Sequence, residues 1–439
     1  MKKWFFLGFL GIVLLLSGCA MRTVEEMYAL PRRSQEYAQL QTAIDSAMYG
    51  LTFSAPQSGD NQQTVQMADL DGDGEKEYLV FAKGATEKPL QILIFKKRPD
   101  GSVFTMETIG TNGQAFEQVE YVNFDDKPGL ELVIGQQLSN QILRSVAVYS
   151  FSDGDAELLL MNSYSKFLTC DLDQNDLCEL LVIGPGELDS GNGLAVLYSS
   201  INGEIYRSVE TEISAYPSEI RRIMPGVLEG GTPAVYISSA VEDDTIVTDV
   251  LAMQSGKFTN ISLYSEAPTS IRTLNNYYIY PVDINGDGVL ELPSLMTMKP
   301  VSIWDQEDQK YLLRWFSLDE NGWEVDKGFT YHNFAGGWYL DLESSWASRI
   351  SVEQGDNVFT FYLWDVSYHG FDMLFQISVL TGSNRDKEAT ENGRFPLYRT
   401  EGVAYAAKLE TGAAQQNITE EYLINAFHRI RDDWQTAEN

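Results

Sequence analysis

The sequence predicts a mainly β fold, a β-propeller of five blades followed by a small α+β domain. The first observation is a repeat whose copies begin near residues 69, 123, 171, 225 and 283; each copy opens with an acidic loop except the eroded copy near residue 225, which has lost it. The second is that a short apolar, β-rich run follows each copy, and the third is that Gly, Pro and Asp separate these runs as turn residues do. A repeat of roughly 50 residues is the length of one four-stranded propeller blade. Six or seven blades are the alternatives if a divergent copy lacks the motif.

The N-terminal segment, residues 1–19, predicts a lipoprotein signal peptide. Lys2 and Lys3 form a positive n-region, residues 4–16 are apolar, and Cys19 follows small residues. An uncleaved membrane anchor is the alternative, but a span needs about 20 apolar residues and this run is shorter. Cleavage before Cys19 and acylation of its thiol, for example with palmitate, would hold the mature chain to the extracytoplasmic face of the cell membrane.

The net charge of −32 excludes nucleic acid as a partner, because a polyanion would be repelled. Much of the acid is clustered in short loops, and clustered carboxylates favour cations. The length of the chain predicts two or three domains after the signal peptide. We expect a linker and helix in residues 20–50, the propeller in residues 51–331 and the α+β domain in residues 332–439.

The strands between successive loops predict the blades. The expected strands of the first blade are residues 77–82, 90–96, 102–109 and 116–122. The last repeat has three evident strands, at residues 292–298, 311–318 and 323–331. Residues 64–68 are expected to supply its fourth strand, which would close the ring and remove exposed sheet edges.

Helical spacing predicts one helix before the propeller and one at the C-terminus. Apolar residues recur every three or four positions across residues 34–48. Near the C-terminus, Asn417 and Glu420 predict a capping box. The residues expected on one face of the helix that follows are Leu423, Phe427, Ile430 and Trp434. Between residues 332 and 416, aromatic β-rich runs alternate with Gly and Asn turns, which favours a separate α+β domain.

The first and last acidic loops have the composition of calcium sites. In such loops, carboxylates at positions one, three and five, a backbone carbonyl at position seven and a later acid surround one ion. The expected ligands in the first loop are Asp69, Asp71, Asp73, the carbonyl of Glu75 and the carboxylate of Glu77. Those in the last loop are Asp283, Asn285, Asp287, the carbonyl of Val289 and the carboxylate of Glu291. The alternative is an Asx-rich turn that binds nothing.

The two loops between them depart from this pattern. The third loop keeps the possible ligands Asp171, Asp173, Asn175 and Glu179. It has Asp176 where glycine is expected, so we predict a strained or weaker site there, or none. In the second loop Lys127 replaces a ligand and would repel a cation, so that loop is expected to be metal-free.

These loops, with residues 65–68 leading into the first of them, resemble the FG-GAP or VCBS repeats of integrin alpha chains and of bacterial lipoproteins. The resemblance covers roughly residues 30–330. It implies a propeller with calcium in the blade loops, and it implies no activity, because such repeats occur in proteins of many functions. The C-terminal domain resembles small antiparallel-sheet domains of the PsbP and Mog1 type.

Two cysteines, Cys170 and Cys178, flank the third loop. Strands on either side of a tight loop can bring two thiols into bonding distance, and an extracytoplasmic compartment permits oxidation. The alternative is a pair of free thiols that pack as small apolar residues.

The sequence contains no recognisable catalytic motif. Its three histidines, His332, His369 and His428, lack zinc spacings, and no Gly-x-Ser-x-Gly elbow occurs. We therefore predict a protein that is not an enzyme, a cell-surface module in which calcium stabilises a propeller that recognises a protein or a glycan. A polysaccharide-acting enzyme and an envelope assembly factor are the alternatives.

Overall fold

The computed structural model describes most of the chain after residue 34. The described residues are 35–430 and 434, apart from 139–142, 153, 186–191, 202–203, 215–218, 243–244, 264–269, 276–278, 302–309 and 368. The predicted signal peptide and the lipid-bearing Cys19 lie outside them. Within the described residues, no helix is both long and apolar enough to cross a membrane.

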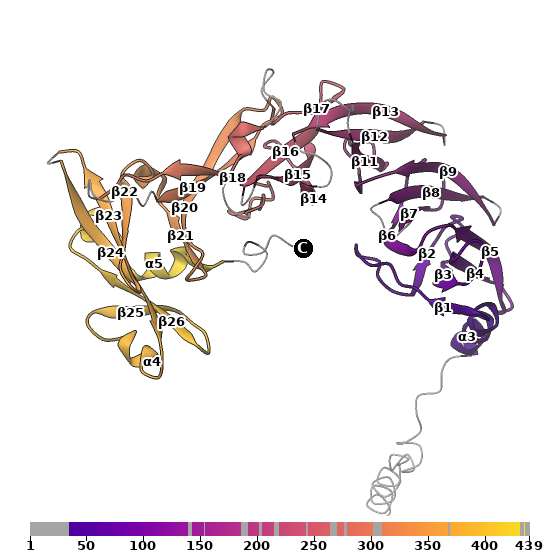
Figure 1. The fold of residues 1–439 in the computed structure, drawn as a ribbon, viewed down its shortest axis with the longest axis horizontal. Helices are drawn as coiled ribbons and strands as arrows, with labels where there is room; N and C mark the ends of the chain where they lie inside the picture. Colours follow the sequence, from indigo (N-terminus) through magenta and orange to yellow (C-terminus); the bar gives the residue numbers. More distant parts are fainter. Residues whose placement is uncertain are drawn as a thin grey trace, which may run out of the picture. The chain divides into compact units, whose positions relative to one another are not determined.

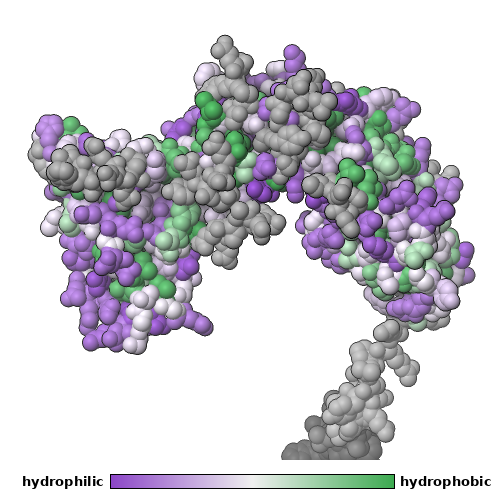
Figure 2. Space-filling model, in the orientation of Figure 1, coloured by the Kyte–Doolittle hydropathy of each residue, from purple (hydrophilic) through white to green (hydrophobic). Residues whose placement is uncertain are grey.

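The described residues form six antiparallel sheets, which confirms the prediction of a mainly β fold (Figure 1). The chain divides into two compact units, one of residues 1–55, 63–68 and 75–112 and the other of residues 56–62, 69–74 and 113–439. In Figure 2, hydrophilic residues gather on the part of the second unit that contains α4 (Arg385–Glu388), β25 (Arg394–Arg399) and β26 (Val403–Leu409).

The described part of the first unit contains one helix and one sheet. The helix α3 (Gln35–Ala47) forms where the apolar spacing predicts it, and its Leu40 and Ile44 pack on Val80, Leu93 and Phe95. The strands of the sheet are β1 (Leu51–Phe53), β2 (Val65–Ala68), β3 (Glu77–Gly84), β4 (Leu90–Lys97) and β5 (Val103–Thr111). Both β1 and β2 pair with β3, and β4 and β5 follow in order.

The second unit begins with three four-stranded sheets in which neighbouring strands follow the order of the chain. Their strands are β6 (Ala115–Val122), β7 (Glu131–Gln137), β8 (Arg144–Ser152) and β9 (Asp155–Ser163); β10 (Lys166–Cys170), β11 (Glu179–Pro185), β12 (Gly193–Ile201) and β13 (Glu204–Ile213); and β14 (Ile220–Val227), β15 (Pro233–Glu242), β16 (Thr245–Gln254) and β17 (Lys257–Asn260).

Each of the first three acidic loops joins two paired strands of one sheet, which corrects the predicted phase of the repeat. The segment expected as the fourth strand of blade one is β6, and it pairs with β7 across the second loop. The segment expected to close the ring is β2, and it pairs with β3 across the first loop. A hairpin across a short loop closes with little loss of chain entropy, so local pairing prevails. The described residues therefore show no closed propeller, and the number of blades stays a prediction.

Two five-stranded sheets complete the second unit. One has β18 (Leu292–Thr297), β19 (Tyr311–Leu318), β20 (Glu324–Asn333), β21 (Trp338–Leu342) and β27 (Phe427–Arg429) in that order; the other has β22 (Ile350–Gln354), β23 (Val358–Asp365), β24 (Gly370–Thr381), β26 and β25. One hydrophobic core, which includes Leu312, Trp338 and Phe375, contains residues of both sheets. The domain boundary predicted after residue 331 falls within β20, and the division into domains stays a prediction.

The C-terminal helix is shorter than the apolar spacing predicts. The helix α5 (Glu420–Ala426) begins after Thr419, whose side chain accepts a hydrogen bond from the Tyr422 amide at 3.1 Å, so the predicted capping pair of Asn417 and Glu420 is wrong. Residues 427–429 leave the helix and pair with β21 as β27. The unpaired edge of β21 accepts these residues as a strand, and tertiary pairing therefore overrides the helical periodicity.

An imidazole is packed among aromatic rings beside β20. The ring of His332 stacks on Tyr339, with centroids 4.9 Å apart, and lies 5.5 Å from Trp434. Its Nε2 atom is 2.9 Å from Thr330 Oγ1, and that hydroxyl also accepts a hydrogen bond from the Trp315 indole. Burial lowers the pKa of His332 to about 3, because the charged imidazolium cannot be solvated there.

We predict that His332 contributes to acid destabilisation. The pKa of His332 is lower in the folded chain than in the unfolded chain, so protonation favours unfolding as pH falls from about 6.5 towards 3. The expected loss is at most about 1.4 kcal/mol for each pH unit. In urea unfolding at several pH values, His332→Phe should flatten this slope, whereas the exposed His369→Asn should leave it unchanged. An equal slope in His332→Phe and the parent would contradict the prediction.

Candidate functional site

The third acidic loop brings three carboxylates together. Strand β10 ends just before Asp171, and Glu179 is the first residue of β11. The carboxylate oxygens of Asp171, Asp173 and Glu179 lie within 4.8 Å of one another. Glu179 is buried, and its Oε2 atom accepts a hydrogen bond from the Leu172 amide at 2.8 Å. The loop thus holds its acids convergent instead of letting them point apart into solvent.

The third loop achieves this shape with strained residues. Gln174 and Asp176 have φ angles of 61° and 66°, in the left-handed region. The corresponding positions of the first loop are Gly72 and Gly74, which adopt such angles at little cost. The amide of Asp176 donates a hydrogen bond to Asp171 Oδ2 at 3.0 Å. The Asp171 carboxylate therefore stabilises the turn, which a glycine at position 176 would adopt without strain. This agrees with the strain expected from the missing glycine.

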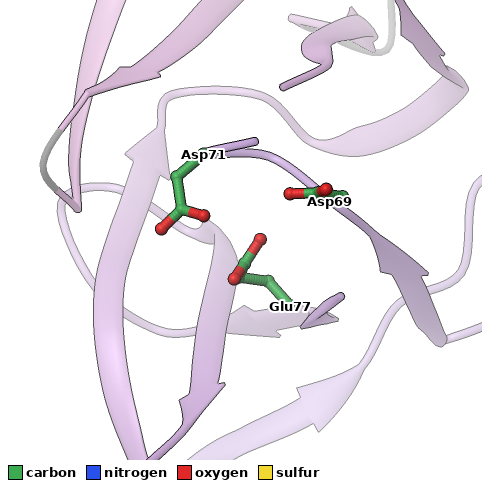
Figure 3. Close-up of side chains that lie close together, drawn as sticks. All are labelled: Asp69, Asp71 and Glu77. Carbon is green, nitrogen blue, oxygen red and sulfur yellow. The ribbon is translucent and has the colours of Figure 1, made fainter. Parts of the chain in front are cut away.

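The first loop shows the same convergence. Figure 3 shows the side chains of Asp69, Asp71 and Glu77 pointing toward one another, and their carboxylate oxygens lie within 4.8 Å of one another. Asp69 accepts hydrogen bonds from the Gly72 and Gly74 amides at 2.8 and 3.0 Å. Asp73 is exposed and is not part of this group. Of the predicted carboxylate ligands, the structure therefore places three at a common point.

The last loop has the same backbone turn but a different charge arrangement. Asp283 accepts hydrogen bonds from the amides of Gly286 and Gly288 at 2.6 and 2.9 Å. The ammonium of Lys327, on β20, lies 2.8 Å from Asp287 Oδ2 and 2.7 Å from Glu229 Oε2. These two carboxylates raise the pKa of Lys327. Within the described residues, the acids of this loop do not form a convergent group of three.

The second loop carries its own lysine, as its sequence indicates. The ammonium of Lys127 lies 2.5 Å from Asp125 Oδ2, and the Lys127 amide donates to Asp125 Oδ1 at 3.0 Å. A metal ion bound to Asp125 would meet this positive charge. The expectation of a metal-free loop therefore has a structural basis, and it stays a prediction.

A buried glutamate follows each of these loops, as the first residue of the next strand in the first three loops and directly before β18 in the last. Glu77, Glu131, Glu179 and Glu291 are all at most 4% exposed. Burial raises the pKa of Glu131, Glu179 and Glu291 to about 7 in each case. A buried carboxylate without a countercharge is costly, and a cation beside it would offset that cost.

The cysteines beside the third loop are free thiols in the structure. Cys170 ends β10, in register with Glu179 of β11. Burial raises the pKa of Cys170 to about 12 and also raises the pKa of Cys178. Both thiols are therefore protonated, and poorly nucleophilic, at neutral pH. The disulfide stays a prediction.

A pocket of about 440 Å³ lies beside the last loop, and no sequence motif indicates it. Its walls come from five segments, which are the loop at residues 284–285, β19, β20, the end of β21 with the two residues after it, and α5. The polar side chains that line it are Asn285, Lys327, Thr330, Asp341, Glu343, Ser344, Tyr422 and Asn425. Segments up to 142 residues apart in the sequence, Ile284 and Ala426, form this pocket, so a local pattern could not have revealed it.

A second hollow, of about 520 Å³, lies beside the exposed indole of Trp323. Two arginines line it, but both are engaged. Arg272 donates to the backbone carbonyls of Ser262 and Gly322, and Arg314 pairs with Glu324 and Asp326. Neither guanidinium is therefore poised for an added anion.

No family model matches the sequence. No curated protein matches it either. Among solved structures, a protein from Lactobacillus plantarum is 10% identical, with 74% of this chain and 95% of that chain covered and a TM-score of 0.25. The rhamnogalacturonan lyase YesW is 13% identical, with 76% and 81% covered and a TM-score of 0.29. A rhamnogalacturonan lyase from Bacillus licheniformis is also 13% identical, with 74% and 72% covered and a TM-score of 0.27.

These comparisons correct one prediction. The sequence predicted a protein that is not an enzyme, but several of the similar solved structures are lyases, so we withdraw that exclusion. With TM-scores below 0.3, the likeness assigns neither a reaction nor an active site to this chain. The resemblance to FG-GAP or VCBS repeats has no family match behind it and stays an expectation. The comparisons name no family for this chain.

Proposed function

We propose that this chain is a calcium-binding repeat protein whose first and third acidic loops each hold an ion. The observation that carries the proposal is the convergence of Asp171, Asp173 and the buried Glu179, whose oxygens lie within 4.8 Å of one another. Calcium takes oxygen ligands at about 2.3 to 2.6 Å, so oxygens on one ion lie no more than about 5 Å apart. The carboxylates fit that limit.

The chemistry of these loops favours calcium over softer metals. Hard carboxylate and carbonyl oxygens select Mg²⁺, Ca²⁺ or Mn²⁺, whereas zinc prefers nitrogen and sulfur ligands. The nearby sulfur atoms belong to Cys170 and Cys178, whose raised pKa values keep them as thiols, and the thiolate is the form that binds metal. A loop with several flexible oxygen donors suits calcium better than the strict octahedron of magnesium.

The bound calcium ion would stabilise the fold. It would neutralise three acids, one of them buried, where β10 turns into β11, and binding to the folded state alone stabilises it by mass action. With a lipid on Cys19, the chain would work on the extracytoplasmic side of a membrane, where calcium is abundant. There we propose that it recognises a glycan, which the polar pocket beside α5 favours over a flat protein surface.

Calcium titration tests the ion-binding proposal. We expect calorimetry on the chelator-treated mature protein to show two bound ions, with a rise in the melting temperature. Stabilisation of about 2.7 kcal/mol is expected at a calcium concentration of 100 times Kd. Glu179→Gln should remove one ion, whereas the exposed Glu157→Gln on β9 should bind as the parent does. No heat and no thermal shift at millimolar calcium would overturn the proposal.

Without calcium, Glu179→Gln is expected to have the opposite effect on the stability of the fold. Burial raises the pKa of Glu179 from its usual value of 4.5 to about 7, so the ion-free protein loses stability as pH rises from about 4.5 to about 7, and the full cost is present above pH 7. Glu179→Gln removes that charge and keeps an oxygen for the Leu172 amide. Above pH 7, in a chelating buffer, the variant should be at least as stable as the parent. A loss of stability in chelator would mean that the carboxylate serves the fold without an ion.

The last loop offers a gain-of-binding test. Lys327→Met removes the ammonium from Asp287 and should allow a third ion to bind, so that calorimetry counts three sites instead of two. Lys257→Met changes the net charge equally at the exposed start of β17 and should leave two sites. A variant that still binds two ions would show that the lysine does not exclude calcium.

A further inference from the structure

We propose that the pocket between β20, β21 and α5 is a binding site for a neutral saccharide of one or two rings. The inference rests on the glycan recognition proposed above, and it does not depend on calcium. The pocket volume of about 440 Å³ lies within the range of roughly 300 to 1,000 Å³ found for small-molecule sites.

Regular secondary structure fixes the polar groups of the pocket. Asp341 is in β21 and Glu343 directly follows that strand, and both residues line the pocket. Tyr422 and Asn425 are three positions apart on α5, which places them on one face of the helix. One strand end and one helix face therefore present four polar side chains to the same space.

The walls are rigid before any ligand arrives. The Trp315 indole donates to the buried Thr330 hydroxyl at 2.8 Å, which fixes the floor formed by β19 and β20. Thr419 caps the first turn of α5. Pairing of β27 with β21 ties the end of that helix to the opposite wall. A preformed site loses little conformational entropy on binding, which favours affinity for a small ligand.

The charge of the pocket excludes an anionic ligand. Asp341 and Glu343 are exposed carboxylates, and both also raise the pKa of Tyr422, after the larger effect of burial. The one ammonium in the lining, that of Lys327, is already held by Asp287 and Glu229. With a net charge of −32 on the chain, a sugar acid or a phosphate would be repelled.

The remaining groups match a ring that carries hydroxyls. The carboxylate of Glu343 accepts hydrogen bonds, as does Asp341, whose Oδ2 atom lies 2.8 Å from His428 Nε2. The amide of Asn425 both donates and accepts, whereas the amide of Asn285 is engaged by Asp287 and Glu291 of its own loop. Phe329, Leu342 and Ala426 line the same pocket and offer apolar surface to the C–H face of a sugar ring. Polar groups of both kinds beside a small apolar wall are the lining expected of a selective small-molecule site.

The test uses the full mature chain and defined probes. Cellobiose, maltose, lactose and chitobiose are neutral probes, digalacturonate is the acidic probe and spermidine is the cationic probe, all measured by calorimetry. We expect one neutral disaccharide or more to bind and neither charged probe to do so. Asn425→Ala should weaken binding about tenfold, the cost of one or two hydrogen bonds, and Asn425→Trp should fill the pocket and abolish it. Glu421→Gln, on α5 but outside the lining, should bind as the parent does.

Three outcomes would overturn the inference: no neutral probe binds, a charged probe binds better, or Asn425→Trp binds unchanged while its melting temperature shows a folded protein. If Asn425→Trp does not fold, Asn425→Ala decides, because it only truncates an exposed side chain. Calcium titration of the same samples separates the two proposals. Calcium binding without saccharide binding overturns this inference alone, and saccharide binding that Asn425→Trp does not affect keeps glycan recognition but moves the site.

Discussion

The buried glutamate at the start of the strand after each acidic loop is the constraint on which the repeat depends. In three of the loops its side chain accepts a hydrogen bond from the backbone amide of the second loop residue, as Glu131 does from Phe124 and Glu179 from Leu172. Phe124 and Leu172 are themselves buried. The buried apolar side chain thus anchors the loop, and the glutamate accepts a hydrogen bond from the backbone amide of the same residue. In these loops the hairpin therefore brings a buried carboxyl group with it.

That charge must be neutralised, and the copies do so differently. In the third loop the acids converge on a common point, where a cation could lie. The second loop places Lys127 beside Asp125, and the last receives Lys327 from a strand 40 residues away. In the copy between β14 and β15 the acidic cluster is absent, and a short turn closed by Leu228 and Thr232 replaces it. The same hairpin thus occurs with three convergent acids, with a lysine beside its acids, or without the acidic cluster.

The sequence predicts the local parts of this fold well and the long-range parts poorly. Each loop is evident from its spacing of acids, and so is the apolar strand after it. The phase of the repeat is not evident from the sequence, because a period of about 50 residues is the same whether β6 is the last strand of one sheet or the first strand of the next. Lys327 and Asn425 could not be assigned to a site from the sequence, because the acids that pair with Lys327 and the strands that line the pocket with Asn425 lie far away along the chain. The stop of α5 at Ala426 depends equally on a distant strand edge.

The last copy shows why the loop and the pocket should be considered together. Lys327 bridges Asp287 of the loop and Glu229 of the turn before β15, and its stem lines the pocket. The same ammonium therefore takes the place of a cation in the loop and leaves no free positive charge in the pocket. If the acids of the last loop had kept an ion instead, a lysine at this position would face the pocket unpaired and would favour anionic ligands. The neutral specificity that we infer for the pocket is thus a consequence of how this one loop neutralises its acids.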